Sequence, residues 1–172
     1  MKLSDDDFTL FSLPQRFALD RDALDVQWRA LQAQVHPDRF AADGAAAQRL
    51  AMQWAVRVNE AHRRLRDPLQ RAAYLCELRG APMGLHDNTA MPADFLMQQM
   101  DWREALDAAQ DVTAVEAIDE HVDRAQREML ARLAEQIDAQ GDMAAAARTV
   151  RALMFIARFR DDIGRRLEAL GQ

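Results

Sequence analysis

Two helical stripes that meet at a proline constrain the fold of this chain most strongly. Apolar side chains recur at helical spacing in both stripes. They are Leu24, Trp28, Leu31 and Val35 before the proline, and Leu50, Trp54, Val58, Ala61 and Leu65 after it. Pro37 lacks a backbone donor and disfavours helical geometry at His36, so the first helix must end there. We therefore predict two antiparallel helices joined by a polar corner that presents His36 and Asp38 to solvent.

The corner alone does not identify a function. His36 can complement the dipole at the end of the first helix, and Asp38 can begin a turn. Three residues of this kind can also occur together by chance in a polar corner. Taken alone, the corner is therefore best explained as an ordinary helix end.

The rest of the chain also predicts helices, and the fold class is all-α. Residues 1–7 are polar and are expected to fray, and either Asp20 or Asp22 can cap the helix that ends near Val35. The further helices are expected at 8–11, 45–66, 69–78, 93–109, 112–140 and 142–170. Glycines and prolines gather at 80–92, so we predict domains at 1–79 and 93–172 joined by this linker. Short connections favour a three-helix bundle for the second domain.

The helix that begins at Ala93 has more apolar positions than one core stripe needs. A complete stripe is supplied by Phe95, Trp102, Leu106 and Ala109. Another face then carries Leu96, Met97 and Met100, with Asp101 and Glu104 beside them. Flexible methionines beside carboxylates suit an adaptable surface for a protein partner. The alternatives are a wide core stripe or a face covered by the first domain.

The last helix shows a similar excess. Val150, Leu153, Met154 and Ala157 can face the bundle, which would leave Phe155 and Phe159 at its edge or beyond it. The net charge of −6 arises in the second half of the chain. An acidic half argues against a nucleic-acid partner and suits a basic protein surface. Solvated helix faces are the simpler explanation of the same charges.

Residues for catalysis or metal binding do not assemble in the sequence. The four histidines, which are His36, His62, His86 and His121, show no metal-ligand spacing. The single cysteine, Cys76, excludes an internal disulfide and is expected to be a buried small residue. No glycine-rich phosphate loop, arginine-flanked leader or long apolar run is present. We expect no enzyme activity, no cofactor, no membrane partner and a cytoplasmic location.

Three sequence strings together resemble one protein family. They are Phe8-Thr9-Leu10-Phe11, Val35-His36-Pro37-Asp38-Arg39-Phe40 and Asp67-Pro68-Leu69-Gln70-Arg71-Ala72-Ala73-Tyr74-Leu75. Their layout is similar to that of the HscB branch of J-domain proteins, which are co-chaperones in iron–sulfur cluster assembly. The resemblance runs from about Asp7 to Leu170. It implies an N-terminal J-domain helical hairpin followed by a C-terminal three-helix bundle.

The resemblance also implies two partners and the residues that meet them. A dedicated heat-shock chaperone ATPase of the HscA type would be contacted by His36, Pro37, Asp38, Arg39 and Arg29. An iron–sulfur scaffold protein of the IscU type would be contacted by Leu96, Met97, Met100, Asp101, Glu104 and Phe155. No catalytic or metal-binding residue is implied, and the chain would be a monomer or weak dimer.

The sequence departs from the family pattern on α-helical faces of both halves, at Asp101 and before the corner. Asp101 stands where a longer glutamate is usual, which shortens the reach of that contact. Before the corner, Arg21 and Arg29 stand beside Asp22 and Asp25, whereas a strongly basic face is usual in J-domains. This favours a dedicated chaperone over a general one. The alternatives are a helical interaction or dimerisation protein, and a general J-domain co-chaperone with another client.

Overall fold

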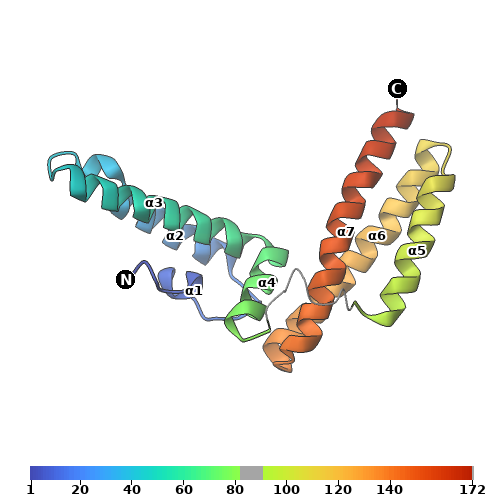
Figure 1. Cartoon of the computed structure of the whole chain (residues 1–172), viewed down its shortest axis with the longest axis horizontal. Coiled ribbons are helices and arrows are strands. Elements are labelled where there is room, and N and C mark those ends of the chain that lie inside the picture. Colours follow the sequence, from blue (N-terminus) through green and yellow to red (C-terminus); the bar gives the residue numbers. More distant parts are fainter. Residues whose placement is uncertain (82–90, 172) are drawn as a thin grey trace. The chain divides into compact units, whose positions relative to one another are not determined.

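The computed structural model describes residues 1–81 and 91–171. Within these ranges the ordered elements are all helical, which confirms the predicted fold class (Figure 1). The chain divides into two compact units, Met1–Leu75 and Cys76–Gln172. Most of the predicted linker, including His86, lies outside the described residues. The predicted domain boundaries, 1–79, 80–92 and 93–172, therefore stay a prediction.

The first unit is built on a helical hairpin. Helix α2 (Arg21–Val35) lies beside α3 (Ala45–Arg66), and the short α1 (Asp7–Leu10) packs on α3 (Figure 1). The carboxylate of Asp20 accepts the backbone N–H groups of Asp22 and Ala23, so Asp20 caps α2. A single 3₁₀ turn, η1 (Pro37–Phe40), follows α2, and α4 (Pro68–Leu78) follows α3.

The predicted apolar stripe of α3 is wrong at one position. Leu50 is exposed, and its neighbour Ala51 is buried instead. The buried row continues through Val58, Ala61 and Leu65, so Ala51 lies seven residues before Val58 and keeps the helical phase. A neighbouring residue is rotated by about 100° around the helix, which takes Leu50 off the core face.

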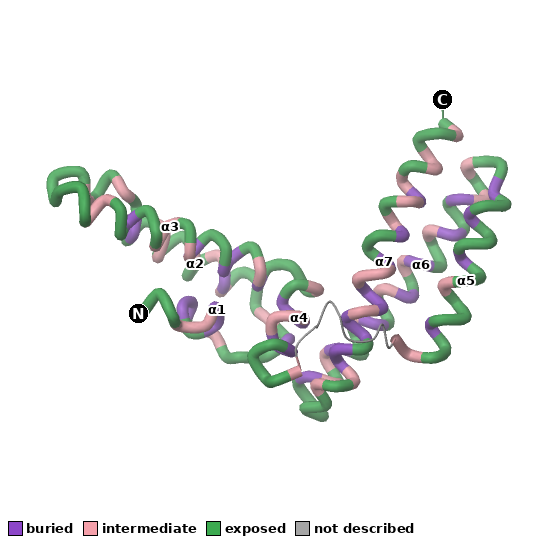
Figure 2. The backbone as a smooth tube through the Cα atoms, in the orientation of Figure 1, coloured by how far each residue is buried: buried purple, intermediate pink, exposed green. Residues whose placement is uncertain are grey.

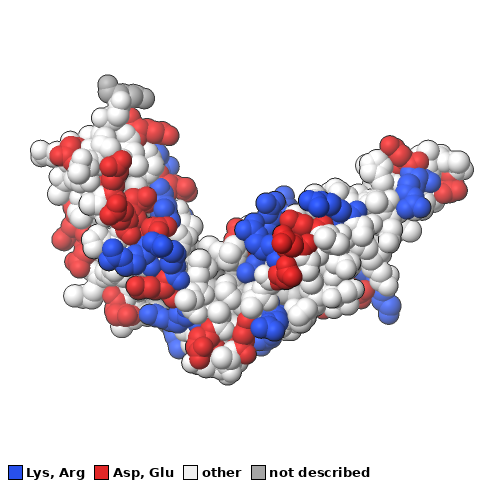
Figure 3. Space-filling model, turned by 180° about the vertical axis from the view of Figure 1, so that it is seen from behind, with Lys and Arg blue, Asp and Glu red and all other residues white. Residues whose placement is uncertain are grey.

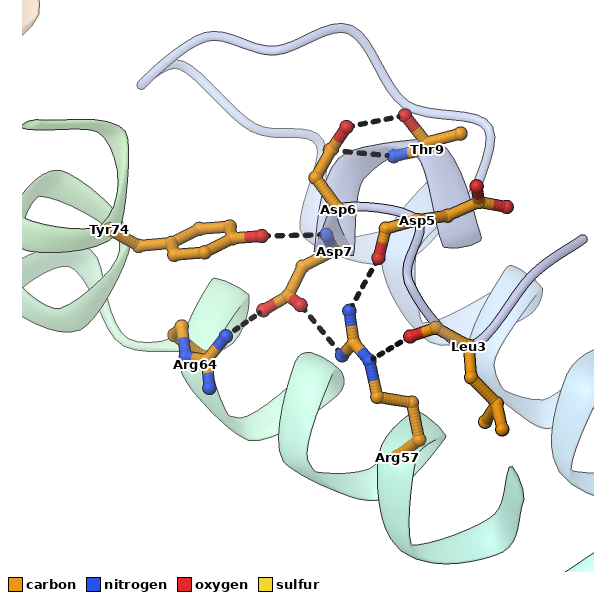
Figure 4. Close-up of polar contacts among 8 residues, drawn as sticks. All are labelled: Leu3, Asp5, Asp6, Asp7, Thr9, Arg57, Arg64 and Tyr74. Atoms are coloured by element: carbon orange, nitrogen blue, oxygen red, sulfur yellow. Dashed lines mark hydrogen bonds and ion pairs between the residues drawn. The ribbon is translucent and has the colours of Figure 1, made fainter. Parts of the chain in front are cut away.

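The start of the chain is anchored by a buried carboxylate, contrary to the expected fraying. Asp7 is fully buried, with its Oδ1 2.7 Å from Nη1 of Arg57 and its Oδ2 2.9 Å from Nη1 of Arg64 (Figure 4). The first contact is an ion pair without an aligned hydrogen bond. Arg57 also donates to the carbonyl groups of Leu3 and Asp5, and the Asp7 N–H donates to the Tyr74 hydroxyl. These contacts order residues 3–7 against α3 and α4.

Asp7→Asn should lower the free energy of unfolding by about 3 kcal/mol, the lower end for breaking a buried ion pair. The lower end applies because both arginines are partly exposed and can recover some hydration. Urea unfolding followed by circular dichroism measures the change. The exposed Asp43→Asn serves as the control and should unfold like the wild type. Equal urea midpoints for Asp7→Asn and the wild type would contradict the prediction.

The second unit is a three-helix bundle of α5 (Ala93–Ala108), α6 (Val112–Ala134) and α7 (Met143–Leu170). A π-helical turn, η2 (Glu135–Ala139), extends α6. Gly141 then separates this helical stretch from α7, and its φ of 63° is one that glycine adopts without strain. The side chains of Asp111 and Asp142 cap α6 and α7. Figure 2 shows buried positions recurring along each of these helices.

The predicted core stripe is confirmed for α5 and wrong in part for α7. Phe95, Trp102, Leu106 and Ala109 are all buried. On α7, Phe159 is completely buried, whereas Ala157 is exposed. The actual row runs through Val150, Leu153, Ile156, Phe159 and Ile163, at spacings of three and four. The predicted stripe omitted Ile156. The buried row that contains Ile156 also contains Phe159, which therefore lies in the core.

Candidate functional site

The corner of the first unit gathers four of the predicted chaperone-contact residues in one turn. His36 ends α2 and also caps η1, because its Nδ1 accepts the N–H of Asp38 at 3.3 Å. Pro37 is the first residue of η1, and Nη1 of Arg39 donates to the carbonyl of Ala33 at 3.2 Å. The turn is therefore fixed by local hydrogen bonds and does not need a buried core.

The polar groups of the corner face solvent. The side chains of His36 and Asp38 are 57% and 90% exposed. Since Nδ1 of His36 accepts a hydrogen bond, the neutral ring carries its proton on Nε2, which leaves that donor available to a partner. Arg29 is exposed on α2, two helical turns before the corner. The corner can thus offer a partner an imidazole donor, a carboxylate acceptor and a guanidinium.

A polar cluster that the sequence did not reveal joins the start of α2 to the end of α3, at the other end of the hairpin from the corner. Nε2 of His62 lies 2.8 Å from Oδ1 of Asp25, and this hydrogen bond is the main cause that lowers the pKa of Asp25. The His62 ring stacks on Trp28, with centroids 4.1 Å apart and an interplanar angle of 11°. Nε1 of Trp28 donates to Oδ1 of Asn59 at 3.0 Å. Asp25, which the sequence showed only as an acidic neighbour of Arg21 and Arg29, therefore helps to set the register of the hairpin.

An exposed apolar row lies on α5 in the second unit. Leu96, Met97 and Met100 are 41%, 69% and 60% exposed, and we call them the α5 apolar face. Asp101 and Glu104 are exposed beside it. The buried stripe of the same helix points into the bundle, so the alternative of one wide core stripe does not hold for these three residues.

Phe155 lies on α7 beside this face, and its side chain is half-buried. Its ring meets the edge of Phe95 at 5.7 Å and stacks on Phe159 at 5.9 Å. Trp102 adds contacts to Phe95 and Phe159, so four aromatic rings join α5 to α7. Phe155 is the outermost of the four, because the other three are buried.

Arg103 is a residue of this region that the sequence did not single out. Its guanidinium carbon lies 5.5 Å from the ring centroid of Phe155 and 5.7 Å from that of Phe159. Its Nη1 is 3.7 Å from Oδ2 of Asp162. The only available signal was spacing, since Arg103 follows Leu96 by seven residues and Met100 by three.

The charged side chains are mixed in sign, and the thiol of Cys76 is only weakly acidic. Basic and acidic side chains are interspersed on the faces seen in Figure 3, where no continuous basic stripe is visible. Burial raises the pKa of Cys76 to about 11, so its thiol is protonated at neutral pH and is a poor nucleophile. Among residues 1–81 and 91–171, no three His, Cys, Asp or Glu side chains gather as metal ligands. No helix in these ranges could cross a membrane.

Comparisons with known proteins agree with both units. Residues 91–164 match the family described as the HSCB C-terminal oligomerisation domain. The co-chaperone protein HscB homolog of Burkholderia multivorans is 51% identical over 173 residues, which covers 99% of this chain and 98% of that protein. The chain belongs to the HscB family of co-chaperones. The homolog of Burkholderia cenocepacia is 50% identical over the same length.

Solved structures of the HscB family show the same fold. Chaperone HscB from Vibrio cholerae has a TM-score of 0.80 and 39% identity, covering 96% of this chain and 99% of that one. Human co-chaperone protein HscB has a TM-score of 0.89 and 24% identity, covering 100% of this chain and 86% of its own. The second likeness bears on the fold alone. Both units of this chain therefore have counterparts within one family.

Proposed function

We propose that this HscB-family co-chaperone links two proteins. Its first unit stimulates the ATPase of a dedicated heat-shock chaperone of the HscA type through His36, Pro37, Asp38, Arg39 and Arg29. Its second unit holds an iron–sulfur scaffold protein of the IscU type through the α5 apolar face, Phe155, Asp101 and Glu104. The chain itself carries out no reaction in this proposal. We also propose a cytoplasmic location, because the free thiol of Cys76 fits a reducing compartment.

The observation that carries the proposal is the exposure of Leu96, Met97 and Met100 on a helix whose core stripe is already complete. A row of apolar side chains that stays exposed to water on a bundle helix costs free energy and is typical of a binding surface. Methionine side chains can adapt to a partner, and the carboxylates of Asp101 and Glu104 can attract a basic one. The corner offers an exposed polar surface of different chemistry, so the two units suit different partners.

The wild-type chain tests the proposal directly. Added to an HscA-type chaperone, it should raise the rate of ATP hydrolysis, and an IscU-type scaffold should raise that rate further. Binding of the scaffold to the chain alone, measured by calorimetry, should be detectable without chaperone or nucleotide. A chain that binds the scaffold but stimulates no such chaperone would refute the chaperone half only. A chain that stimulates but does not bind would refute the scaffold half.

A second candidate is self-association, favoured by the oligomerisation named in the description of the matching family. In that case the α5 apolar face would meet a second copy of the chain. Sedimentation over a range of concentrations separates the two candidates. A dimer lost when Leu96 and Met97 become alanine would favour self-association, while a monomer that binds scaffold would favour the proposed function.

A further inference from the structure

We propose that Arg103 is a positioning residue that holds Phe155 in place at the edge of the α5 apolar face. The inference rests on the proposed function of that face. It adds Arg103, which affects partner binding only through Phe155. Three contacts carry it: two between the guanidinium and the rings of Phe155 and Phe159, and one ion pair with Asp162. All three run from α5 to α7.

The placement of these residues follows from helical spacing. Phe155, Phe159 and Asp162 are separated by four and three residues, so they lie in one row on α7. On α5, Arg103 continues the row of Leu96 and Met100. Its guanidinium therefore reaches from the row on α5 to the row on α7. Asp162 also pairs with Arg165, which holds the carboxylate in place on α7.

Phe155 needs such support because its ring is only partly enclosed. Phe95 and Phe159 contact it within the bundle, and Phe155 is still partly exposed. A planar guanidinium near a ring is attracted by the negative charge of the ring face. The side chain of Arg103 thereby restricts the orientations of Phe155 before a partner arrives. A contact group that is already ordered loses less conformational entropy on binding.

The local charge argues against direct recognition of the partner by Arg103. Asp101 and Glu104 are acidic neighbours on the same helix, so the rim favours a basic partner. A cation in that rim would repel such a partner. Arg103 is already paired with Asp162 and lies over two rings, which occupies its guanidinium within the unit.

Affinity for an IscU-type scaffold, measured on the full chain, tests the inference through a double-mutant cycle. Arg103→Ala should weaken binding about two- to fivefold, as expected for loss of an exposed cation–π contact. Arg103→Lys should restore part of the affinity, because it keeps the charge without the planar stacking. In a Phe155→Ala background, Arg103→Ala should have no further effect. Arg132→Ala, an exposed change on α6, is the matched control and should bind like the wild type.

Two affinity results would overturn the inference. Unchanged or tighter binding by Arg103→Ala would show that Arg103 does not support the surface. An equal loss with and without Phe155 would show direct contact between Arg103 and the partner.

A measurement without partner separates this inference from the proposed function. In nuclear magnetic resonance spectra of the free chain, Arg103→Ala should shift the ring protons of Phe155, and Arg132→Ala should not. An unchanged Phe155 signal would overturn the positioning role whatever the scaffold does. A wild-type chain that fails to bind scaffold while the Phe155 signal shifts would refute the proposed function and leave the positioning of the ring established.

Discussion

Replacing His36 by glutamine should abolish stimulation of an HscA-type ATPase while changing the free energy of unfolding by no more than about 0.5 kcal/mol. The small effect on stability follows from the structure, since the His36 side chain is largely exposed and its hydrogen bond is local, to the N–H of Asp38. The large effect on function follows from the proposal, because the imidazole is one of the few groups that the corner offers a partner.

Stimulated ATP hydrolysis and a thermal melt check this prediction together. His121→Gln makes the same exchange at an exposed position on α6 and should stimulate like the wild type. Normal stimulation by His36→Gln would remove the corner from the mechanism. A lower melting temperature would instead show that His36 has a structural role that its exposure does not reveal.

Changing Leu96, Met97 and Met100 together to alanine should weaken scaffold binding by at least about 30-fold, since a central apolar anchor is commonly worth roughly 2 kcal/mol. Most of the loss should appear in the dissociation rate. The thermal melt should stay close to that of the wild type, because all three side chains are exposed in the free chain. Phe155 is left out of this variant because it packs on Phe95 and Phe159, so its truncation would also affect stability.

The kinetics of scaffold binding and calorimetric melting together show whether the α5 apolar face binds a partner or belongs to the core. Met52→Ala with Val56→Ala truncates two exposed apolar residues of α3 and is the matched control, which should leave scaffold binding unchanged. A sharp fall in melting temperature for the α5 variant would show that the face is covered within the chain. Full affinity with a normal melt would show that the scaffold binds elsewhere.

Sequence periodicity predicted the helices because each signal lies within a few turns of chain. The corner at Pro37, the breaks at Gly141 and Asp142, and the core stripe of α5 all depend on local spacing or capping. The exposure of Leu96, Met97 and Met100 was also predictable, since Phe95 and Trp102 already completed the core side of that helix.

Long-range pairing could not be predicted in the same way. The partners Asp7 and Arg57 are 50 residues apart in sequence, and Asp25 meets His62 across the hairpin. Nothing in a helical pattern specifies which charges on two helices will meet. The assignment of Phe159 failed for a related reason, because Ile156 lies in the same core row and the pattern alone allowed two phases. Arg103 went unnoticed because its role depends on rings of another helix.

The buried carboxylate near the start of the chain has a practical consequence for the design of fragments. The first string that resembles the family begins at Phe8, so a fragment cut at that string would appear to retain the whole hairpin module. Such a fragment would lack Asp7 and leave Arg57 and Arg64 without their shared anion. An affinity tag is better placed at the far terminus, or joined upstream through a spacer, so that residues 3–7 can still reach α3.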